Sequence, residues 1–383
     1  MMRVLHLFKA YMPESTGGIE QTIFQLCEAC KPWGVTSSVL TLSAEPSPNP
    51  IKVGNHLVYQ AKLDAHIAST GLSREVFGRF RELAREHDVV HYHFPWPLMD
   101  LLHLHARHDK PSVLSYHSDI VRQRLLLQFY RPLMHQFLGS VDRIVTASPN
   151  YLATSDILAH YRDKTDVIPY GLDRSGYAPV DVERMAYWQQ RFPDGFFLFV
   201  GVMRYYKGLH ILLDACSNTE YPVVIVGAGP METRLREQAQ RLRLDNVHFL
   251  GPLADTEKHV LLQLSRGIVF PSHLRSEAFG ISLLEGAMFG KPMISSEIGT
   301  GTSYINISGQ TGLVVPPSDA EALRAAMHQL WHDRELAEKL GQAAAERYRQ
   351  LFTSERMGEQ FNNLYRKLLI GEAQNTRLTQ QLR

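Results

Sequence analysis

The chain has 383 residues, of which 44% are hydrophobic and 21% are charged, and 40 Lys and Arg residues stand against 39 Asp and Glu residues. This length suits two domains of ordinary size, and the composition excludes an intrinsically disordered chain. The balanced charge argues against a dedicated nucleic-acid-binding protein, which usually carries a strong basic excess.

The first half of the chain alternates short apolar runs with helical patterns. We expect helices at 19–30, 72–86 and 120–138, and strands at 4–8, 38–42, 89–93, 112–116 and 143–146. Strands that alternate with helices predict βαβ units and a parallel sheet.

A second series of the same kind follows a segment rich in Gly, Pro and Asp near 170–182. We expect its helices at 209–216, 231–243, 319–332 and 335–350, a last helix capped by Thr353, and strands at 196–200, 223–226, 247–250, 268–270, 292–295 and 312–315. The sequence therefore predicts an α/β protein with two doubly wound, Rossmann-like domains, 1–172 and 183–352, followed by residues 353–383 as a helix with a polar tail. Such sheets bind ligands beyond the carboxyl ends of their strands, so we expect the site in a cleft that both domains face.

The cysteines and the N-terminus indicate the compartment. Cys27, Cys30 and Cys216 do not form a disulfide framework, and we interpret the CxxC pair as small helical residues and not as a redox or zinc site. The N-terminal strand lacks the features of a signal peptide, and no apolar run is long enough to span a membrane. We expect a cytoplasmic protein.

The most specific chemical signal is a pair of carboxylates eight positions apart, Glu277 and Glu285. They flank a loop that turns into an apolar helix, whose first amides are free to bind a diphosphate. That helix start comprises Ala278, Phe279, Gly280 and Ile281. Because a carboxylate accepts two hydrogen bonds in a fixed plane, we assign Glu277 to sugar hydroxyls and Glu285 to ribose hydroxyls. The alternative of Glu285 as a solvated helix residue is disfavoured by its apolar neighbours.

Arg204 and Lys207 follow a predicted strand directly, at its carboxyl end. A planar guanidinium and a compact ammonium together suit diphosphate oxygens, and they would stabilise a leaving diphosphate without a metal. A solvated basic turn is the alternative, and the nearby glutamates favour the functional interpretation. No Asp-x-Asp motif, the usual metal-binding signature of glycosyltransferases, occurs in the chain. We therefore expect no metal cofactor.

Glycines and histidines supply weaker signals. Gly17 and Gly18, after the first strand, and Gly227, after a later strand, would let backbone approach a phosphate closely; ordinary turns are the alternative. His117 follows the strand at 112–116 and is placed to bond the donor sugar. A metal cluster is a minor alternative for four further histidines, because no acidic or cysteine ligand joins them at a familiar spacing: His91, His93, His103 and His105.

Together these residues resemble glycosyltransferase family 4, whose members are retaining enzymes of the GT-B fold. The matching segments span nearly the whole chain: Gly17-Gly18, YHSD at 116–119, PYGLD at 169–173, GVMRYYKG at 201–208, VGAGP at 226–230, FLGPL at 249–253, the 276–296 segment and TGLVVPP at 311–317. The resemblance implies a donor diphosphate bound by the early glycines, Arg204 and Lys207, with His117 at the donor sugar. It also implies that a loop with Leu253, Asp255 and Lys258 contacts the base, and that the C-terminal helix returns to the first domain.

The segment 299–304 resembles a subgroup that builds mannose- or rhamnose-containing surface polysaccharides such as O-antigen, which implies a GDP-linked donor. Asp255 suits guanine, which offers two adjacent N–H donors, although a UDP-sugar is not excluded by the pattern. Retention without an evident nucleophile favours front-face attack, with the departing phosphate oxygen as base.

We expect the acceptor to be a saccharide, lipid-linked in the cell, that contacts the first domain. We assign to the acceptor side His93, Trp96 in a Pro-Trp-Pro loop, and Asp119. Residues 120–138 contain three arginines and no acidic residue, so a basic amphipathic helix on an anionic membrane is one interpretation and a core helix the other.

Three other functions fit the same general shape. A sugar-nucleotide epimerase would need acids on both sides of the sugar, and the glutamate pair fits transfer better. A nicotinamide-dependent dehydrogenase is disfavoured by the incomplete GxGxxG at 227–232, where Glu232 replaces the last glycine. A non-catalytic sugar-nucleotide sensor is disfavoured by the intact set of charged residues.

Overall fold

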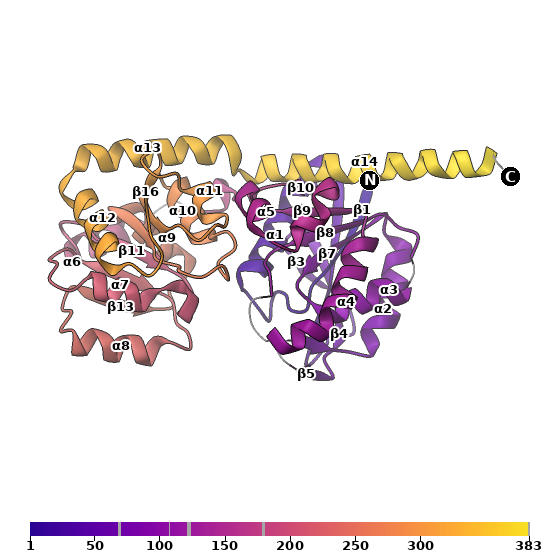
Figure 1. Ribbon diagram of the computed structural model, residues 1–383, viewed down its shortest axis with the longest axis horizontal. Coiled ribbons are helices and arrows are strands. Elements are labelled where there is room, and N and C mark those ends of the chain that lie inside the picture. The colour runs from indigo at the N-terminus through magenta and orange to yellow at the C-terminus, as the bar shows by residue number, and fades with distance from the viewer. Residues whose placement is uncertain (68–69, 107, 121–123, 178–180, 382–383) are drawn as a thin grey trace. The chain divides into compact units, whose positions relative to one another are not determined.

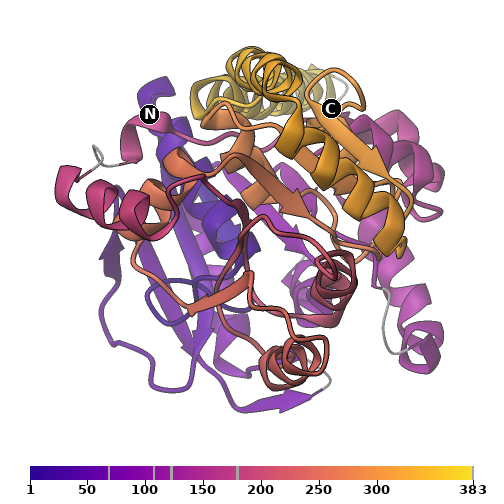
Figure 2. The ribbon, with the colours of Figure 1, turned by 90° about the vertical axis from the view of Figure 1, so that its left-hand side faces the viewer.

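The computed structural model describes residues 1–67, 70–106, 108–120, 124–177 and 181–381. The chain divides into two compact units, shown in Figures 1 and 2. Unit 1 comprises Met1–Ala147, Ser155–Gly171 and Ser354–Arg383, and unit 2 comprises Ser148–Thr154 and Leu172–Thr353. The short segment 148–154 thus clusters with the second unit, whereas the sequence suggested one cut between 172 and 183.

Unit 1 contains an eight-stranded sheet in the order β10-β9-β8-β7-β1-β2-β4-β3. All neighbouring strands are parallel except β3 and β4. Its strands are β1 (Met2–Leu7), β2 (Val35–Ser43), β3 (Ile51–Val53), β4 (His56–Lys62), β7 (Val89–Phe94), β8 (Ser112–Tyr116), β9 (Arg143–Thr146) and β10 (Thr165–Val167), with a separate hairpin of β5 (Ala65–Ile67) and β6 (Thr70–Leu72). Its helices are α1 (Gly18–Cys30), α2 (Glu75–Glu86), α3 (Pro97–Ala106), α4 (Arg124–Ser140) and α14 (Ser354–Gln381), with short 3-10 helices at Lys31–Trp33 and Leu158–Lys164.

The start of α14 is part of the core of unit 1. Met357, Phe361 and Tyr365 pack in one cluster with residues of α1 and of the central strands. Gly358 permits this contact, because a Cβ there would lie 2.1 Å from the carbonyl oxygen of Ala29 in α1. The C-terminal helix therefore covers the α1 face of this sheet.

Unit 2 contains a six-stranded, wholly parallel sheet in the order β13-β12-β11-β14-β15-β16. Its strands are β11 (Phe197–Val200), β12 (Val223–Val226), β13 (Val247–Gly251), β14 (Gly267–Phe270), β15 (Met293–Ser296) and β16 (Gly312–Val315). Its helices are α5 (Pro149–Thr154), α6 (Val182–Arg191), α7 (Leu209–Ala215), α8 (Glu232–Arg241), α9 (Asp255–Leu264), α10 (Ile281–Met288), α11 (Thr302–Ile305), α12 (Ala320–His332) and α13 (Arg334–Leu351), with 3-10 helices at Arg174–Gly176 and Tyr205–Lys207.

Both faces of the second sheet are covered. Val269 belongs to a core cluster with residues of α7, α8 and α12. Its neighbour Ile268 points to the opposite face, where it lies against Gly286 of α10. The predicted doubly wound α/β fold is confirmed, and almost every predicted strand is present within a residue or two.

Some elements differ from the expectation. The sequence did not predict β3 and β4, which extend the first sheet at one edge, or the separate hairpin β5–β6. It also placed Asp255 and Lys258 in a loop, whereas both lie in helix α9. The tail beyond residue 369 continues α14 as far as Gln381.

Candidate functional site

The charged residues expected to bind the donor gather along the carboxyl edge of the sheet in unit 2. Four strands that are neighbours in space, β13, β12, β11 and β14, each end at this edge. Leu253 and Asp255 follow β13, Gly227 follows β12, Arg204 and Lys207 follow β11, and Glu277 follows β14. Parallel pairing therefore brings these separate segments to one side of the unit.

Lys207 and Glu277 form an ion pair in the structure. Only 11% of each side chain is exposed, and the hydroxyl of Ser272 donates a hydrogen bond of 3.2 Å to the same carboxylate oxygen. The Lys207 ammonium also lies 4.9 Å from the ring centroid of Phe270. The pair is thus largely removed from water, where truncating one partner leaves an uncompensated charge.

Glu285 is buried in α10 and holds two partners. The hydroxyl of Tyr177 donates to its Oε1 over 2.9 Å, and the ammonium of Lys258 lies 3.1 Å from the same oxygen. Burial alone would lower the pKa of Lys258, but Glu285 and Asp255 outweigh burial and raise it. Lys258 therefore stays charged and neutralises the buried carboxylate. Glu285 is not a solvated helix residue.

Asp255 and Leu253 lie at the start of α9. Asp255 is the first residue of that helix, and 81% of its side chain is exposed although its carboxylate pairs with Lys258 at 3.1 Å. Leu253 is partly buried just before the helix. An exposed carboxylate beside an apolar side chain can contact a flat, polar ring such as a nucleobase.

Arg204 is exposed, and no ion pair to it is found among the residues that the structure describes. Glycines hold its loop against the next strand end. Gly227 has a φ of 127°, and a Cβ there would lie 2.2 Å from the carbonyl oxygen of Gly201. Gly227 is therefore required for close packing of two backbone segments, and it supports the loop that carries Arg204.

The start of α10 has the geometry expected of an anion site. Gly280 caps the helix with a φ of 102°, a conformation that favours glycine, and the helix begins at Ile281. Ile281 is partly exposed, Ala278 is partly buried, and Phe279 is buried under the loop. As at any helix start, the first amides have no carbonyl of the preceding turn to bond, and the helix dipole favours an anion there.

The carboxyl edge of unit 1 carries histidines instead of ion pairs. His117 follows β8 directly and is buried. Its Nε2 lies 2.9 Å from Nδ1 of His93, and its Nδ1 lies 2.5 Å from the hydroxyl of Tyr170. Burial lowers the pKa of His117 to about 3, so its ring is neutral at physiological pH. Both ring nitrogens therefore hold protein partners, and a sugar hydroxyl would have to replace one of them.

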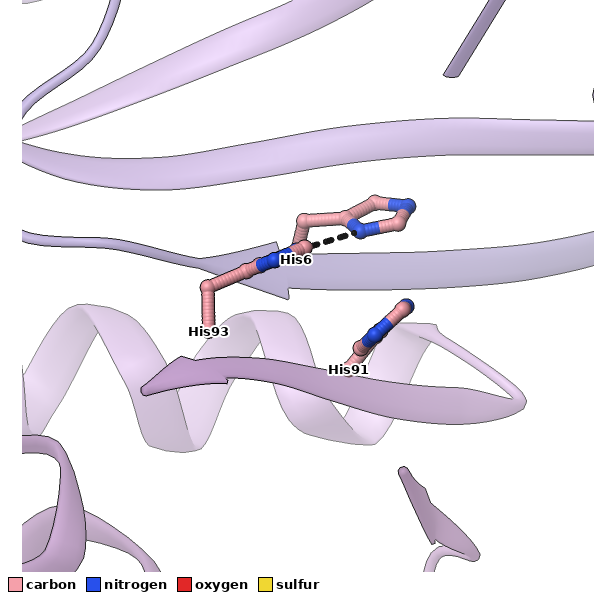
Figure 3. A group of neighbouring side chains, drawn as sticks. All are labelled: His6, His91 and His93. Carbon is pink, nitrogen blue, oxygen red and sulfur yellow. Dashed lines mark hydrogen bonds between the residues drawn. The ribbon is translucent and has the colours of Figure 1, made fainter. Parts of the chain in front are cut away.

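A group of three buried histidines, drawn in Figure 3, includes His93, the hydrogen-bond partner of His117. His6 of β1 and His91 of β7 are partners in the sheet register, and His93 stands two positions further along β7. One ring nitrogen from each lies within 4.8 Å of the others, so these residues are a possible metal-ligand set. His103 and His105, on α3, do not join this group; His103 instead contacts the hydroxyl of Tyr92 at 2.9 Å.

The glycine pair at the start of α1 faces a carboxylate. A Cβ on Gly17 would lie 2.6 Å from Oε2 of Glu20, whereas a Cβ on Gly18 would meet nothing within 4 Å. Glu20 is buried in the first turn of α1 and accepts a 2.6 Å hydrogen bond from Ser15. An acidic side chain therefore occupies part of the helix start that the sequence suggested for a phosphate.

The residues expected on the acceptor side are mostly enclosed by protein. His93 and Trp96 have no exposed surface, and the indole N–H of Trp96 donates to the carbonyl of Gly71 over 3.1 Å. Asp119 accepts hydrogen bonds from Tyr116 at 2.9 Å and from Ser155 at 2.8 Å. These positions do not favour direct contact of either residue with an acceptor, because His93 is enclosed by the rings of neighbouring histidines and the indole of Trp96 by the segment around Gly71.

An open cavity of about 360 Å³ lies instead beside the ends of β1, β2 and β4. Its polar lining comes from several loops: Lys9, Glu14, Ser15, Ser43 and His66. Tyr11 also lines it, and the Tyr11 hydroxyl is fixed at 2.9 Å from Nε2 of His56, whose Nδ1 meets Glu28 at 3.2 Å. This volume and mixed lining are those of a small-molecule site.

The predicted basic helix at 120–138 is described in part. Arg122 lies outside the described residues, as do the side chains of Arg124, Leu125 and Leu126. Within the described part of α4, Phe129 is 86% exposed and Arg131 is also exposed. None of the helices in the described ranges combines the length and apolar character needed to cross a bilayer.

Sequence reasoning missed Tyr177, Ser272, Tyr170 and His6. Tyr177 stands 108 positions from its partner Glu285, and Tyr170 stands 53 positions from His117. No local pattern marks such contacts. One signal was available for His6, because it occupies an inward position of an otherwise apolar strand, where a polar ring needs a partner.

Both units of the chain match families of glycosyltransferases. Residues 16–175 match the family model described as Glycosyltransferase Family 4, and residues 188–347 match that described as Glycosyl transferases group 1. The chain is 63% identical over 353 residues to D-rhamnosyltransferase WbpZ of Pseudomonas aeruginosa, covering 92% of this chain and 93% of the relative. It is 50% identical over 368 residues to O-antigen chain mannosyltransferase C of Escherichia coli, covering 96% and 99%.

Solved structures share the architecture at low sequence identity. Sucrose-phosphate synthase from Thermosynechococcus elongatus has a TM-score of 0.78 and 23% identity, over 97% of this chain and all of that one. Anabaena Alr3699/HepE, solved with UDP and glucose, has a TM-score of 0.77 and 18% identity, over 96% of this chain and all of that one.

Proposed function

The chain belongs to the family 4 glycosyltransferases and has the GT-B fold, and from this premise we propose that it transfers mannose or D-rhamnose from a GDP-sugar to a saccharide acceptor with retention of configuration. The observation that carries the proposal is the charged carboxyl edge of unit 2, with Arg204, the Lys207–Glu277 pair and the Lys258–Glu285 pair. We propose that it acts in O-antigen synthesis, because one relative is an O-antigen chain mannosyltransferase.

The donor diphosphate would bind between Arg204, Lys207 and the start of α10. Arg204 is exposed, and the first amides of α10 add partial positive charge to the two side-chain cations. Because these groups supply the charge that a divalent ion would otherwise provide, we propose that no metal is required.

The nucleoside would extend along α9 and α10. Glu285 would accept from ribose hydroxyls, in a position fixed by Tyr177 and Lys258. Asp255, exposed at the start of α9, would accept from the two adjacent N–H donors of guanine. A uracil ring offers only one such donor, which favours GDP over UDP.

The transfer step requires no protein nucleophile in this proposal. The acceptor oxygen forms a bond to the anomeric carbon on the face from which the diphosphate departs, and the bonding electron pair leaves with the phosphate oxygen. The acceptor proton passes to that oxygen. Arg204 and Lys207 stabilise the departing charge, and Glu277 orients the sugar hydroxyls while holding Lys207 in place.

We propose the 360 Å³ cavity of unit 1 as the acceptor site, in place of His93 and Trp96. Lys9, Glu14 and Ser43 provide both donors and acceptors for sugar hydroxyls, and Leu42 and Leu63 provide apolar surface. Sugars bind well to such mixed surfaces because a pyranose ring carries hydroxyl groups around its edge and exposes C–H groups on its faces.

A nucleotide panel tests the donor. Thermal shifts with GDP, UDP, ADP and dTDP, each in EDTA, should be largest for GDP, because ligand binding stabilises the folded state by mass action. A larger shift with UDP would remove the guanine assignment and keep the transferase. A shift that needs Mg²⁺ would contradict metal-free binding, and no shift with any nucleotide would contradict the donor site.

A further inference from the structure

Four side chains form a continuous line of hydrogen bonds in unit 1. Nδ1 of His6 lies 3.1 Å from Nε2 of His93, and Nδ1 of His93 lies 2.9 Å from Nε2 of His117. The line ends where Nδ1 of His117 meets the hydroxyl of Tyr170 at 2.5 Å. The three histidines are buried, and they come from three neighbouring strands or strand ends.

The histidines are neutral. Burial lowers the pKa of His6 and of His117 to about 3, and it holds the pKa of His93 well below its ordinary value. A neutral imidazole has one N–H and one lone pair, so it can donate through one nitrogen only. Consequently every hydrogen bond in the line must run in the same direction, and all three rings must share one tautomer.

The contact at Tyr170 indicates the direction. Burial raises the pKa of Tyr170, so the phenol keeps its proton. Its 2.5 Å separation from Nδ1 of His117 is short for an N–H donor and suits an O–H donor. When Tyr170 donates, Nδ1 of His117 is an acceptor, and the proton of each ring lies on Nε2.

A bound metal explains the cluster less well. His91 belongs to the candidate ligand set in Figure 3, but its Nδ1 contacts the hydroxyl of Tyr365 at 2.7 Å and its Nε2 contacts that of Ser115 at 2.8 Å. Among the described residues, no carboxylate is a significant electrostatic influence on His6, His91 or His93. A buried divalent cation would therefore lack compensating charge.

We propose that His6 and His93 are positioning residues for His117: Nδ1 of His93 accepts the Nε2–H of His117, and Nδ1 of His6 accepts the Nε2–H of His93. These acceptors favour the tautomer in which Nδ1 of His117 can accept from a donor-sugar hydroxyl that replaces the hydroxyl of Tyr170. This inference rests on the proposed placement of His117 at the donor sugar. It predicts that the sugar hydroxyl must act as a hydrogen-bond donor. It also predicts that a change at His6, two side chains away from His117, alters donor recognition.

The tautomers can be measured directly, without any substrate. Protein labelled with ¹⁵N-histidine gives long-range ¹H–¹⁵N spectra that distinguish a protonated Nδ1 from a protonated Nε2, and single His variants assign the signals. We expect His6, His93 and His117 of the wild type all to be neutral with the proton on Nε2 at pH 7. Mixed tautomers in the line would overturn the proposal, and so would stoichiometric binding of added Zn²⁺ that His91→Leu abolishes.

Two substitutions at His6 then separate positioning from packing. In His6→Asn the amide can occupy the place of Nδ1 and preserve the bond to His93, whereas His6→Leu cannot. We expect His6→Leu to raise the KM for the sugar nucleotide about tenfold, the effect of losing roughly one hydrogen bond, with a smaller change in kcat. His6→Asn should retain the wild-type tautomer of His117 and a KM close to that of the wild type.

The exposed His328→Asn serves as a control that should change neither readout. Equal KM values for His6→Asn and His6→Leu, with the tautomer of His117 unchanged in both, would overturn the positioning role. Lack of activity with every donor would refute the proposed transferase function but not the direction of the hydrogen bonds. The NMR spectra of the histidines test that direction separately.

Discussion

The two parallel sheets of this protein present different chemistry at the same structural position. At the carboxyl edge of unit 2, Lys207 pairs with Glu277 and Lys258 pairs with Glu285. At the carboxyl edge of unit 1, His6, His93 and His117 are neutral and bonded to one another and to Tyr170. Charges suit a diphosphate that gains negative charge during transfer, and neutral donors and acceptors suit hydroxyl groups.

The two units tolerate buried polar groups at strand ends in different ways. In unit 2 each buried carboxylate is neutralised by an ammonium and receives one hydroxyl hydrogen bond, from Ser272 or Tyr177. In unit 1 burial suppresses the charge itself by lowering the pKa values of the histidines. The first arrangement is sensitive to removal of either partner, and the second is sensitive to acid.

The largest effect is expected from Glu277→Gln. It should lower kcat/KM by about 100- to 1000-fold, the range found when one preorganised group that stabilises the transition state is lost. It should also destabilise unit 2 by about 3 kcal/mol, because Lys207 is left buried without its partner. Steady-state kinetics and urea denaturation measure the two effects.

The double variant Lys207→Met with Glu277→Gln sharpens this test. Stability should return toward that of the wild type, because no unpaired charge remains, while activity stays low. Glu232→Gln, which removes a partly exposed carboxylate from an i,i+4 pair with Arg236, is a control that should retain both stability and activity. Additive losses of stability in the double variant would show that the two residues do not act as a pair.

Acid should weaken unit 1 more than unit 2. The lowered pKa values of His6 and His117, about 3, mean that the folded state binds fewer protons than the unfolded state below about pH 6.5. Stability therefore falls as the pH drops from 6.5 toward 3, by about 1.4 kcal/mol per pH unit for each such histidine.

Hydrogen exchange locates this loss of stability. Between pH 7 and pH 5, amides of β1 and β7 should lose more protection than those of β11 and β12, after correction for intrinsic exchange rates. Equal loss in both sheets would argue against histidine burial as the cause.

Arg204→Ala should weaken GDP binding by about 10- to 100-fold, because a hydrogen bond to a charged group contributes roughly 1.5–3 kcal/mol. Since Arg204 is exposed, the stability of the free protein should change little. Isothermal titration calorimetry compares the GDP affinities of the wild type, Arg204→Ala and Arg204→Lys. Because Arg204→Lys keeps the charge but loses the planar guanidinium, its affinity should lie between those of the wild type and Arg204→Ala. Unchanged GDP affinity in Arg204→Ala would remove this residue from the donor site.

The smallest effect is expected from Tyr177→Phe. The variant loses the 2.9 Å hydrogen bond to Glu285 and keeps the aromatic packing against His259. Stability should fall by about 1 kcal/mol and GDP affinity by a few-fold, because Lys258 still holds the carboxylate. A loss as large as that of Arg204→Ala would mean that Tyr177 itself contacts the nucleotide.

The sequence was sufficient to predict the architecture and the charged residues at the carboxyl edge of the sheet in unit 2. Apolar runs alternating with helical patterns predicted both sheets, and the position of Glu285 among apolar residues predicted that it needs a partner. The partner itself was not predictable, because Tyr177 reaches Glu285 only after α10 and the segment before α6 have folded together. Local sequence carries no record of such distant contacts.

The first unit was harder to interpret from its sequence. The histidines of β7 alternate as a strand requires, but the sequence did not show that His6 and His117 complete a line with His93. Trp96 was assigned to the acceptor side because its Pro-Trp-Pro loop follows a strand end, yet its indole is buried and donates to the carbonyl of Gly71. Burial of a loop residue depends on which segments fold over it, here the unpredicted β5–β6 hairpin.

We propose that the charged edge of unit 2 carries out metal-free transfer from a GDP-sugar with retention of configuration. The most direct measurement is incubation with GDP-mannose or GDP-D-rhamnose and a lipid-linked saccharide acceptor in EDTA, with NMR of the product's anomeric carbon. We predict a product with the α configuration of the donor, at a rate that Mg²⁺ does not increase and that Glu277→Gln nearly abolishes. A β-linked product would contradict retention, and transfer only when a divalent cation is added would contradict metal-free catalysis.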